Sequence, residues 1–309
     1  MKNRARGCML GQLAGDALGS LVEFQTPDQI RRKYPDGVRK LEDGGVWNTI
    51  AGQPTDDSEM ALMLARILVK DGLYDPDRAL ERYRYWLNSK PFDCGMTIHA
   101  GLQGQPDFDS QANGAMMRVS PLGIFGAKHP LSAVGSWAIQ DAALTHPNAV
   151  CLQANALFTM AIAHAVASGC GARKLYQNIY QWAVHMDIGS TLMTAIKTAA
   201  ENSPLPDYTK QQGWVLIAFH NALWQLLHAY DFEEGVVSTA MMGGDTDTNA
   251  AICGALLGAV YGIDAVPAQW LDSILNCRPW AGDPGVHRPR PECFWPCDAL
   301  ELADQLSVK

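Results

Sequence analysis

The 309-residue chain has 48% hydrophobic and 18% charged residues, a balance typical of a globular protein with a large core. Its net charge of −8 and its lack of a long basic run argue against nucleic-acid binding, which needs a basic face. The chain has no uninterrupted stretch of about 18 apolar residues, so we expect no membrane span. We also expect no signal peptide. The eight cysteines include no C-x-x-C pair, so we expect reduced thiols in a cytoplasmic protein.

Helical periodicity dominates the chain. The segments predicted as helices are 4–22, 57–70, 76–89, 94–103, 130–144, 148–168, 171–186, 188–200, 213–229, 233–241, 247–261 and 267–276. Because no strand pattern or linker interrupts them, we predict an all-α fold, a single domain over residues 1–309. From about residue 278 the chain is rich in Pro, Arg and Trp and predicts an irregular tail. Within it we expect Trp280, Phe294 and Trp295 to pack on the body.

Two predicted helices carry small residues at every turn on one face. The first has Gly7, Gly11, Gly15 and Gly19, and the late one has Ala250, Gly254, Gly258 and Gly262. A glycine inside a helix costs about 1 kcal/mol relative to alanine, so each series needs a compensating gain. A gain of this kind arises when the glycines allow the helix backbone to approach a neighbouring element closely. We therefore predict that both helices lie at the crowded centre of the bundle, where they can contact each other.

Two short acidic motifs each stand directly before a helix. They are Thr55-Asp56-Asp57 and Gly243-Gly244-Asp245-Thr246-Asp247-Thr248. Either motif alone is explained by helix capping, since Thr and Asp oxygens accept the free N–H groups and suit the positive end of the helix dipole. Together they bring four carboxylates into two similar sites, and such a cluster repels itself unless cations neutralise it. Hard oxygen donors without Cys or His select Mg²⁺, Mn²⁺ or Ca²⁺.

These motifs resemble, in order, those of the ADP-ribosylglycohydrolase family, which includes the dinitrogenase-reductase-activating glycohydrolases and the ADP-ribosyl-acceptor hydrolases. The matching pieces cover roughly residues 5–272. They are Gly11-x-x-x-Gly15-Asp16-Ala17-Leu18-Gly19 with Glu23, Thr55-Asp56-Asp57, Asn113-Gly114-Ala115-Met116-Met117-Arg118, Thr145-His146-Pro147 and Gly243-Gly244-Asp245-Thr246-Asp247-Thr248. The resemblance implies an orthogonal helical bundle with a cleft that binds two divalent cations, Mg²⁺ or alternatively Mn²⁺.

The resemblance also implies roles for individual residues. The metal ligands would be Thr55, Asp56, Asp57, Asp245, Asp247 and Thr248. Asp57 and Asp245 would also count as catalytic, together with Glu23 and Asp93. Glu23 would be a metal ligand, a gate or an acid/base, with a solvated helix end as the alternative. Asp93 stands where some members have an acid that orients the water, although its surroundings depart from the family pattern.

The residues implied to bind substrate lie in two further motifs. They are Asn113, Gly114, Ala115, Met116, Arg118 and His146. Small residues in the first motif would let backbone N–H groups approach a diphosphate. For Arg118 a structural ion pair is the alternative, and for His146 a structural hydrogen bond. Asp16 is expected to make a buried polar contact and to take no part in chemistry.

The implied activity is hydrolysis of the N- or O-glycosidic bond between ADP-ribose and an acceptor. Arginine is the commonest acceptor in the branch with this motif set, and the substrate would be an ADP-ribosylated protein. The alternatives are serine-linked ADP-ribose, O-acetyl-ADP-ribose, poly-ADP-ribose or another N-glycoside. A non-catalytic ADP-ribose-binding or structural member is a further alternative, although intact acidic motifs argue against it. We expect a monomer with no nucleic-acid or membrane partner.

Overall fold

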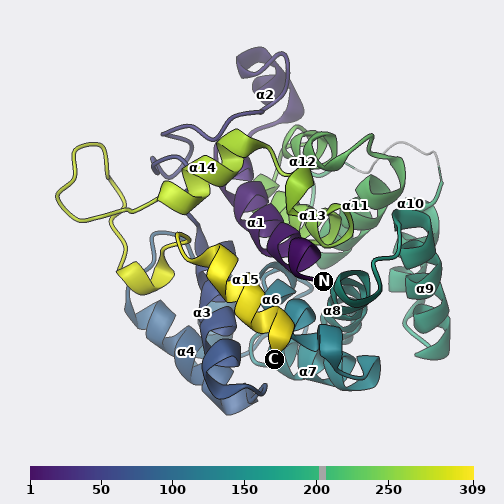
Figure 1. Ribbon diagram of the computed structural model, residues 1–309. Coiled ribbons are helices and arrows are strands. Elements are labelled where there is room, and N and C mark those ends of the chain that lie inside the picture. Colours follow the sequence, from purple (N-terminus) through teal and green to yellow (C-terminus); the bar gives the residue numbers. More distant parts are fainter. Residues whose placement is uncertain (202–206) are drawn as a thin grey trace.

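Helices account for the regular structure of residues 1–201 and 207–309, the parts of the chain that the computed structural model describes. Over these residues the only β-pairing consists of two isolated bridges, so the predicted all-α bundle is confirmed (Figure 1). The α-helices are α1 (Lys2–Gly19), α2 (Pro27–Lys33), α3 (Asp56–Asp71), α4 (Pro76–Asn88), α5 (Met96–Leu102), α6 (Ser120–Phe125), α7 (Leu131–Ala143), α8 (Ala149–Ser168), α9 (Ala172–His185), α10 (Ser190–Ala199), α11 (Val215–His228), α12 (Phe232–Ala240), α13 (Thr246–Tyr261), α14 (Ala268–Asn276) and α15 (Ala299–Val308). Short 3₁₀ helices are η1 (Met116–Arg118), η2 (Gly126–Lys128), η3 (Ile263–Ala265) and η4 (Glu292–Phe294).

The glycine faces of α1 and α13 lie against each other at the centre of the bundle (Figure 1). A Cβ atom added to Gly15 would overlap the carbonyl oxygen of Ala250, and one added to Gly254 would overlap the carbonyl oxygen of Gly11. The predicted close approach is therefore confirmed. This contact also brings the end of α1 next to the start of α13, where the second acidic motif lies. There the Thr246 hydroxyl donates to the Gly19 carbonyl at 2.7 Å.

The main hydrophobic cluster takes buried side chains from helices between α1 and α15. α8 is long and apolar enough to cross a membrane by length and composition alone, but 72% of its most apolar stretch is buried inside the bundle. α8 is thus a core helix of this fold. It packs against α6 and α7 on one side and against α13 on the other.

Three helices were not predicted. α2 and α6 have 7 and 6 residues, too few for the helical period to show in the sequence. α2 is instead defined by its start, where the Thr26 side chain accepts from the Gln29 backbone N–H and the Gln29 side chain accepts from the Thr26 N–H. The third is α15, which lies in the segment predicted to be irregular.

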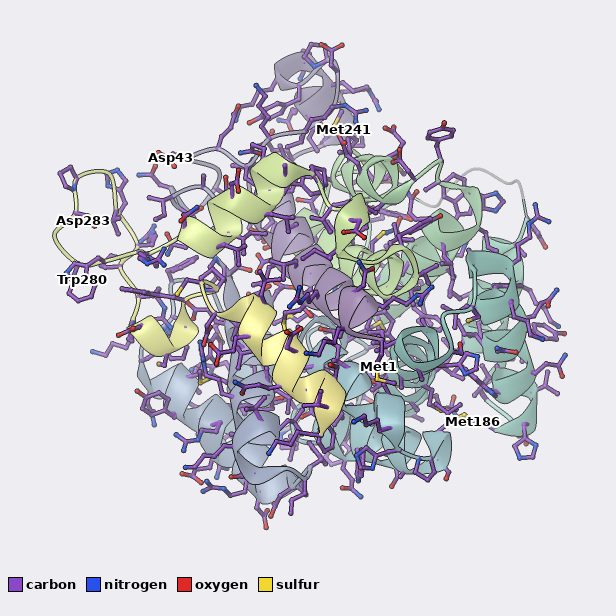
Figure 2. All side chains as sticks on the ribbon, in the orientation of Figure 1. Met1, Asp43, Met186, Met241, Trp280 and Asp283 are labelled. Carbon is purple, nitrogen blue, oxygen red and sulfur yellow. The ribbon has the colours of Figure 1, made fainter. Side chains whose placement is uncertain are left out.

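The prediction of an irregular tail is wrong for Ala299–Val308. Its buried residues, among them Leu302, Ala303 and Leu306, place α15 against α1 and α3, and only this packing makes so short a segment helical. Between α14 and α15 the chain forms an irregular loop that projects from the helical body, with Trp280 and Asp283 on it (Figure 2). Phe294 and Trp295 are buried as expected, whereas Trp280 is 56% exposed.

Candidate active site and metal centre

A cavity of about 400 Å³ opens where the end of α1, the starts of α3 and α13 and the loops before α5 and η1 meet. Its lining, within the described residues, contains five carboxylates and no lysine or arginine. The lining residues are Glu23, Phe24, Asp56, Asp93, Cys94, Gly95, Met96, Thr97, Ile98, Ala112, Asn113, Gly114, Met117, His146, Gln212, Gly213, Asp245, Asp247 and Thr248. The cavity therefore carries concentrated negative charge that no neighbouring cationic side chain offsets.

The two acidic motifs meet at Asp57, just beneath the cavity. The hydroxyl oxygens of Thr55 and Thr248 lie 3.1 and 3.4 Å from Asp57 Oδ2, so Thr55 shares this carboxylate with a residue 191 positions beyond Asp57. Asp57 Oδ1 is buried and has no hydrogen-bond partner. A buried carboxylate oxygen without a partner is unfavourable in a protein, and a cation satisfies it.

Helix capping explains only part of the motifs, since Asp247 Oδ1 accepts from the Thr248 backbone N–H at 2.9 Å in the first turn of α13. Thr55 and Asp245 stand at the N-cap positions of α3 and α13, and neither side chain makes a capping hydrogen bond. In α3 that task falls to Asp16 of α1, which accepts hydrogen bonds from the backbone N–H groups of Thr55 at 3.1 Å and Ser58 at 3.2 Å. Asp16 is thus the buried polar contact that the sequence predicted, and the motif carboxylates remain available for other ligands.

Glu23 joins the second motif. One carboxylate oxygen each from Glu23, Asp245 and Asp247 can be chosen so that all three lie within 4.8 Å of one another, a spacing that suits one shared cation. Glu23 is only 4% exposed, which contradicts the alternative of a solvated helix end. Asn113 fixes the orientation of this group, because its side-chain N–H donates to Asp245 Oδ2 at 2.7 Å.

The acids of the cleft hold protons unusually well when no cation is bound. Burial, with the charges of Asp93 and Asp245, raises the pKa of Glu23 to about 8. Burial, with the charges of Asp16 and Asp245, raises the pKa of Asp93 to about 7. Burial first, and neighbouring carboxylates second, also raise the pKa values of Asp56, Asp57 and Asp247 well above their usual range. The carboxylates of the cleft repel one another, and either a bound proton or a bound metal ion relieves this repulsion. The raised pKa values therefore indicate a site that also favours cations.

The donor set fits divalent cations. All the candidate ligand atoms are carboxylate or hydroxyl oxygens, which hard cations prefer, and the unpartnered Asp57 oxygen lies among them. Of the predicted ligands, Asp56, Asp245, Asp247 and Thr248 line the cavity, whereas Thr55 and Asp57 lie beneath it. Glu23 makes a further candidate ligand.

Part of the cavity lining carries no acidic side chain. Gly114 and His146 line it, and a Cβ on Gly114 would lie 3.2 Å from His146 Cε1, so the glycine allows this approach. His146 Nδ1 lies 2.7 Å from the Thr145 hydroxyl, while the buried Nε2 has no partner. Burial, with the charge of Arg118, lowers the pKa of His146 to about 3, so the ring is neutral at working pH.

Three predicted substrate-binding residues lie outside the cavity lining. Ala115 and Met116 are fully buried. Arg118 is also fully buried and pairs with Asp141 at 3.1 Å, which is the structural ion pair that the sequence left open. Arg118 supports the acid-free part of the lining from behind, because its guanidinium donates to the carbonyl oxygen of Gly114 at 3.2 Å.

Several cavity residues were missed by the sequence analysis. Phe24 and Met96 form part of the lining and are 57% and 90% exposed, so both lie towards the opening. Phe24 adopts a left-handed backbone conformation with φ of 61°, which is uncommon for a bulky residue and typical of functional positions. Its place directly after Glu23 was the available signal. For Gln212 and Gly213 the sequence held no such signal, because an isolated β-bridge between Ala112 and Trp214 brings them to the site.

Comparison with known proteins agrees with this geometry. The model of one protein family, ADP-ribosylglycohydrolase, matches residues 1–306. The chain belongs to the ADP-ribosylglycohydrolase family. The ADP-ribosyl-[dinitrogen reductase] glycohydrolase of Rhodospirillum rubrum is 31% identical over 88% of this chain and 90% of its own length. The ADP-ribosylarginine hydrolase Tri1 of Pseudomonas putida is 26% identical over 88% of this chain and 74% of its own length.

A solved structure shares the whole fold. An ADP-ribosylglycohydrolase-related protein complex superposes with a TM-score of 0.81 and 26% identity, covering 99% of this chain and 98% of that one. This ADP-ribosylglycohydrolase is therefore an enzyme that hydrolyses glycosidic bonds, which confirms the predicted enzyme class. Family members depend on metal ions, and the acidic cluster of Glu23, Asp245 and Asp247 is the candidate metal site of this chain.

Proposed function

We propose that this ADP-ribosylglycohydrolase removes ADP-ribose from arginine side chains of modified proteins, with two Mg²⁺ ions as cofactors. The observation that carries the proposal is the cavity itself, which combines five carboxylates, here called the floor, with a part free of acids, here called the wall, where His146 has a ring nitrogen without a partner. ADP-ribose has a matching polarity, because its ribose hydroxyls can approach cations on the floor while its diphosphate contacts the wall. The eight unpaired cysteines support the expected cytoplasmic location.

Each side of the cavity takes one part of the substrate. On the floor, Thr55, Asp56, Asp57, Asp245, Asp247 and Thr248 would hold the cations together with Glu23. Bound cations would supply the positive charge that polarises oxygen atoms of ribose and water. On the wall, His146 can donate from Nε2 to a phosphate oxygen when the Thr145 hydroxyl donates to Nδ1. The backbone N–H of Gly114 would add a further donor to the diphosphate, whereas that of Asn113 already donates to the Gly213 carbonyl.

Asp93 is the proposed proton acceptor. It lines the cavity, and burial with the charges of Asp16 and Asp245 raises its pKa in the cation-free protein, so this carboxyl group takes up a proton more readily than an exposed aspartate does. The reaction requires a water oxygen to bond to the anomeric carbon as the bond from this carbon to the arginine nitrogen breaks. Asp93 takes a proton from the attacking water and returns it to the departing nitrogen, so the carboxylate is regenerated. The products are free ADP-ribose and an unmodified arginine.

The arginine assignment is supported by the opening of the cavity. The ring of Phe24 lies there, next in the chain to the Glu23 carboxylate. An exposed aromatic ring suits a planar guanidinium, which can stack on it. Relatives named for ADP-ribosylarginine and for ADP-ribosyl-dinitrogen reductase support the same acceptor.

The test compares two linkages. The purified protein is incubated with arginine-linked and with serine-linked ADP-ribosyl peptides, in Mg²⁺ or in EDTA, and free ADP-ribose is measured. We expect metal-dependent release from the arginine peptide and a loss of more than about 100-fold in Asp245→Asn, which keeps the shape of the side chain but removes its charge. Release from the serine peptide alone would refute the arginine assignment. Equal release in EDTA would refute the role of the cations.

A further inference from the structure

The irregular loop between α14 and α15 reaches the active site from behind, a position that the proposed reaction does not use. Arg288 in this loop contacts both ends of the segment 47–53: its side-chain Nε donates to the Trp47 carbonyl at 2.8 Å, and its own carbonyl accepts from Gln53 Nε2 at 2.6 Å. The segment therefore has a fixed position, although it contains no helix.

The loop is itself anchored by a buried ion pair. Arg290 donates to both carboxylate oxygens of Glu59 at 2.7 Å, and the two side chains are 4% and 2% exposed. The Trp86 indole donates to the same carboxylate at 2.8 Å. Glu59 lies in the first turn of α3, next to the candidate ligands Asp56 and Asp57. The loop and the acidic floor thus share one anchoring point.

Trp47 connects this anchored segment to the cavity. Its indole N–H donates to Glu23 Oε2 at 2.7 Å. Its ring also lies 5.9 Å, centroid to centroid, from that of Phe92, the residue before Asp93. One side chain therefore contacts an acid of the floor directly and, through Phe92, borders the loop that carries the proposed proton acceptor. Trp47 itself is not part of the cavity lining.

We propose that Trp47 is a positioning residue that holds Glu23 in place for the shared cation, and that Arg288 holds Trp47. A hydrogen bond to Oε2 restrains the carboxylate of Glu23, whose group lies within 4.8 Å of those of Asp245 and Asp247. Residues that orient a metal ligand in this way typically contribute about 10- to 100-fold to metal affinity or activity. The inference rests on the cation site of the proposed function.

The experiment measures Mn²⁺ binding by calorimetry, without substrate. Trp47→Phe keeps an aromatic ring beside Phe92 and removes the N–H donor. We expect about 10-fold weaker Mn²⁺ binding in this variant. The matched control is Trp280→Phe, at a tryptophan of the α14–α15 loop that meets the Trp295 ring edge-on and is 56% exposed, and this variant should bind Mn²⁺ as the wild type does. Arg288→Ala, which leaves the indole in place, should weaken binding by about 3-fold.

A double-mutant cycle separates positioning from a general structural role. In a Glu23→Gln background, Trp47→Phe should change Mn²⁺ affinity by less than about 2-fold, because the carboxylate through which it acts is gone. An equally large loss in both backgrounds would overturn the proposal, as would unchanged binding in Trp47→Phe. Failure of the wild type to bind Mn²⁺ would overturn the cation site itself, and the role of Trp47 with it.

Discussion

The contact between α1 and α13 allows a quantitative prediction at Gly15. In Gly15→Ala the new methyl group would overlap the carbonyl group of Ala250, so the two helix backbones must separate. Alanine favours the helix by about 1 kcal/mol relative to glycine. Overpacking costs about 1–3 kcal/mol where side chains can move, and more where backbone atoms must move. We therefore expect a net loss of about 3 kcal/mol in the free energy of unfolding.

The control is Gly135→Ala in α7. There the added methyl group would lie 3.0 Å from the Met160 sulfur, the flexible part of a side chain that can shift. This variant should be as stable as the wild type within about 1 kcal/mol, because the helix preference of alanine offsets the small displacement.

The assay is thermal unfolding followed by circular dichroism, with calorimetric Mn²⁺ binding on the same samples. A loss of about 3 kcal/mol corresponds to roughly 6 °C for a chain of this size. Mn²⁺ binding should weaken too, since α1 leads to Glu23 and α13 begins beside Asp245. A melting temperature in Gly15→Ala equal to that of the control would refute the argument that backbone contact requires the glycines.

Three further predictions concern the site. Burial raises the pKa of Glu23 from 4.5 to about 8 in the cation-free protein, so the folded state in EDTA holds this proton more tightly than the unfolded chain does. The folded state therefore loses stability as the pH rises from 4.5 to about 8. Melting in EDTA should be several degrees lower at pH 8 than at pH 6, and Mg²⁺ should reduce the difference; the opposite slope would contradict the shift. His146→Ala should raise KM for an ADP-ribosylated peptide about 10-fold with little change in kcat, through loss of one hydrogen bond to a charged group; an unchanged KM would exclude that contact. Arg118→Leu leaves the Asp141 carboxylate buried and unpaired and should cost about 3–5 kcal/mol in urea unfolding, whereas a loss below about 1 kcal/mol would argue against a structural ion pair.

Local sequence patterns determined much of this protein. Helical periodicity and the absence of strand patterns predicted the all-α fold, because long amphipathic helices are defined by residues close together in the chain. The glycine series predicted that α1 and α13 meet, since a repeated unfavourable residue needs a compensating contact. The acidic motifs predicted a cation site, because clustered carboxylates require neutralisation.

Only the tertiary structure decided which partners these residues have. Asp16 caps α3 from another helix, so the Thr55 side chain is not its cap, and no pattern within the Thr55 motif reveals this. Arg118 turned out to face Asp141 and lies outside the cavity, because burial depends on the packing of α4, α7 and η1. The backbone of Trp47, whose side chain contacts Glu23, is hydrogen-bonded by Arg288, 241 positions further along the chain. Such long-range contacts follow from the packing of the whole chain, and the sequence around any one residue does not encode them.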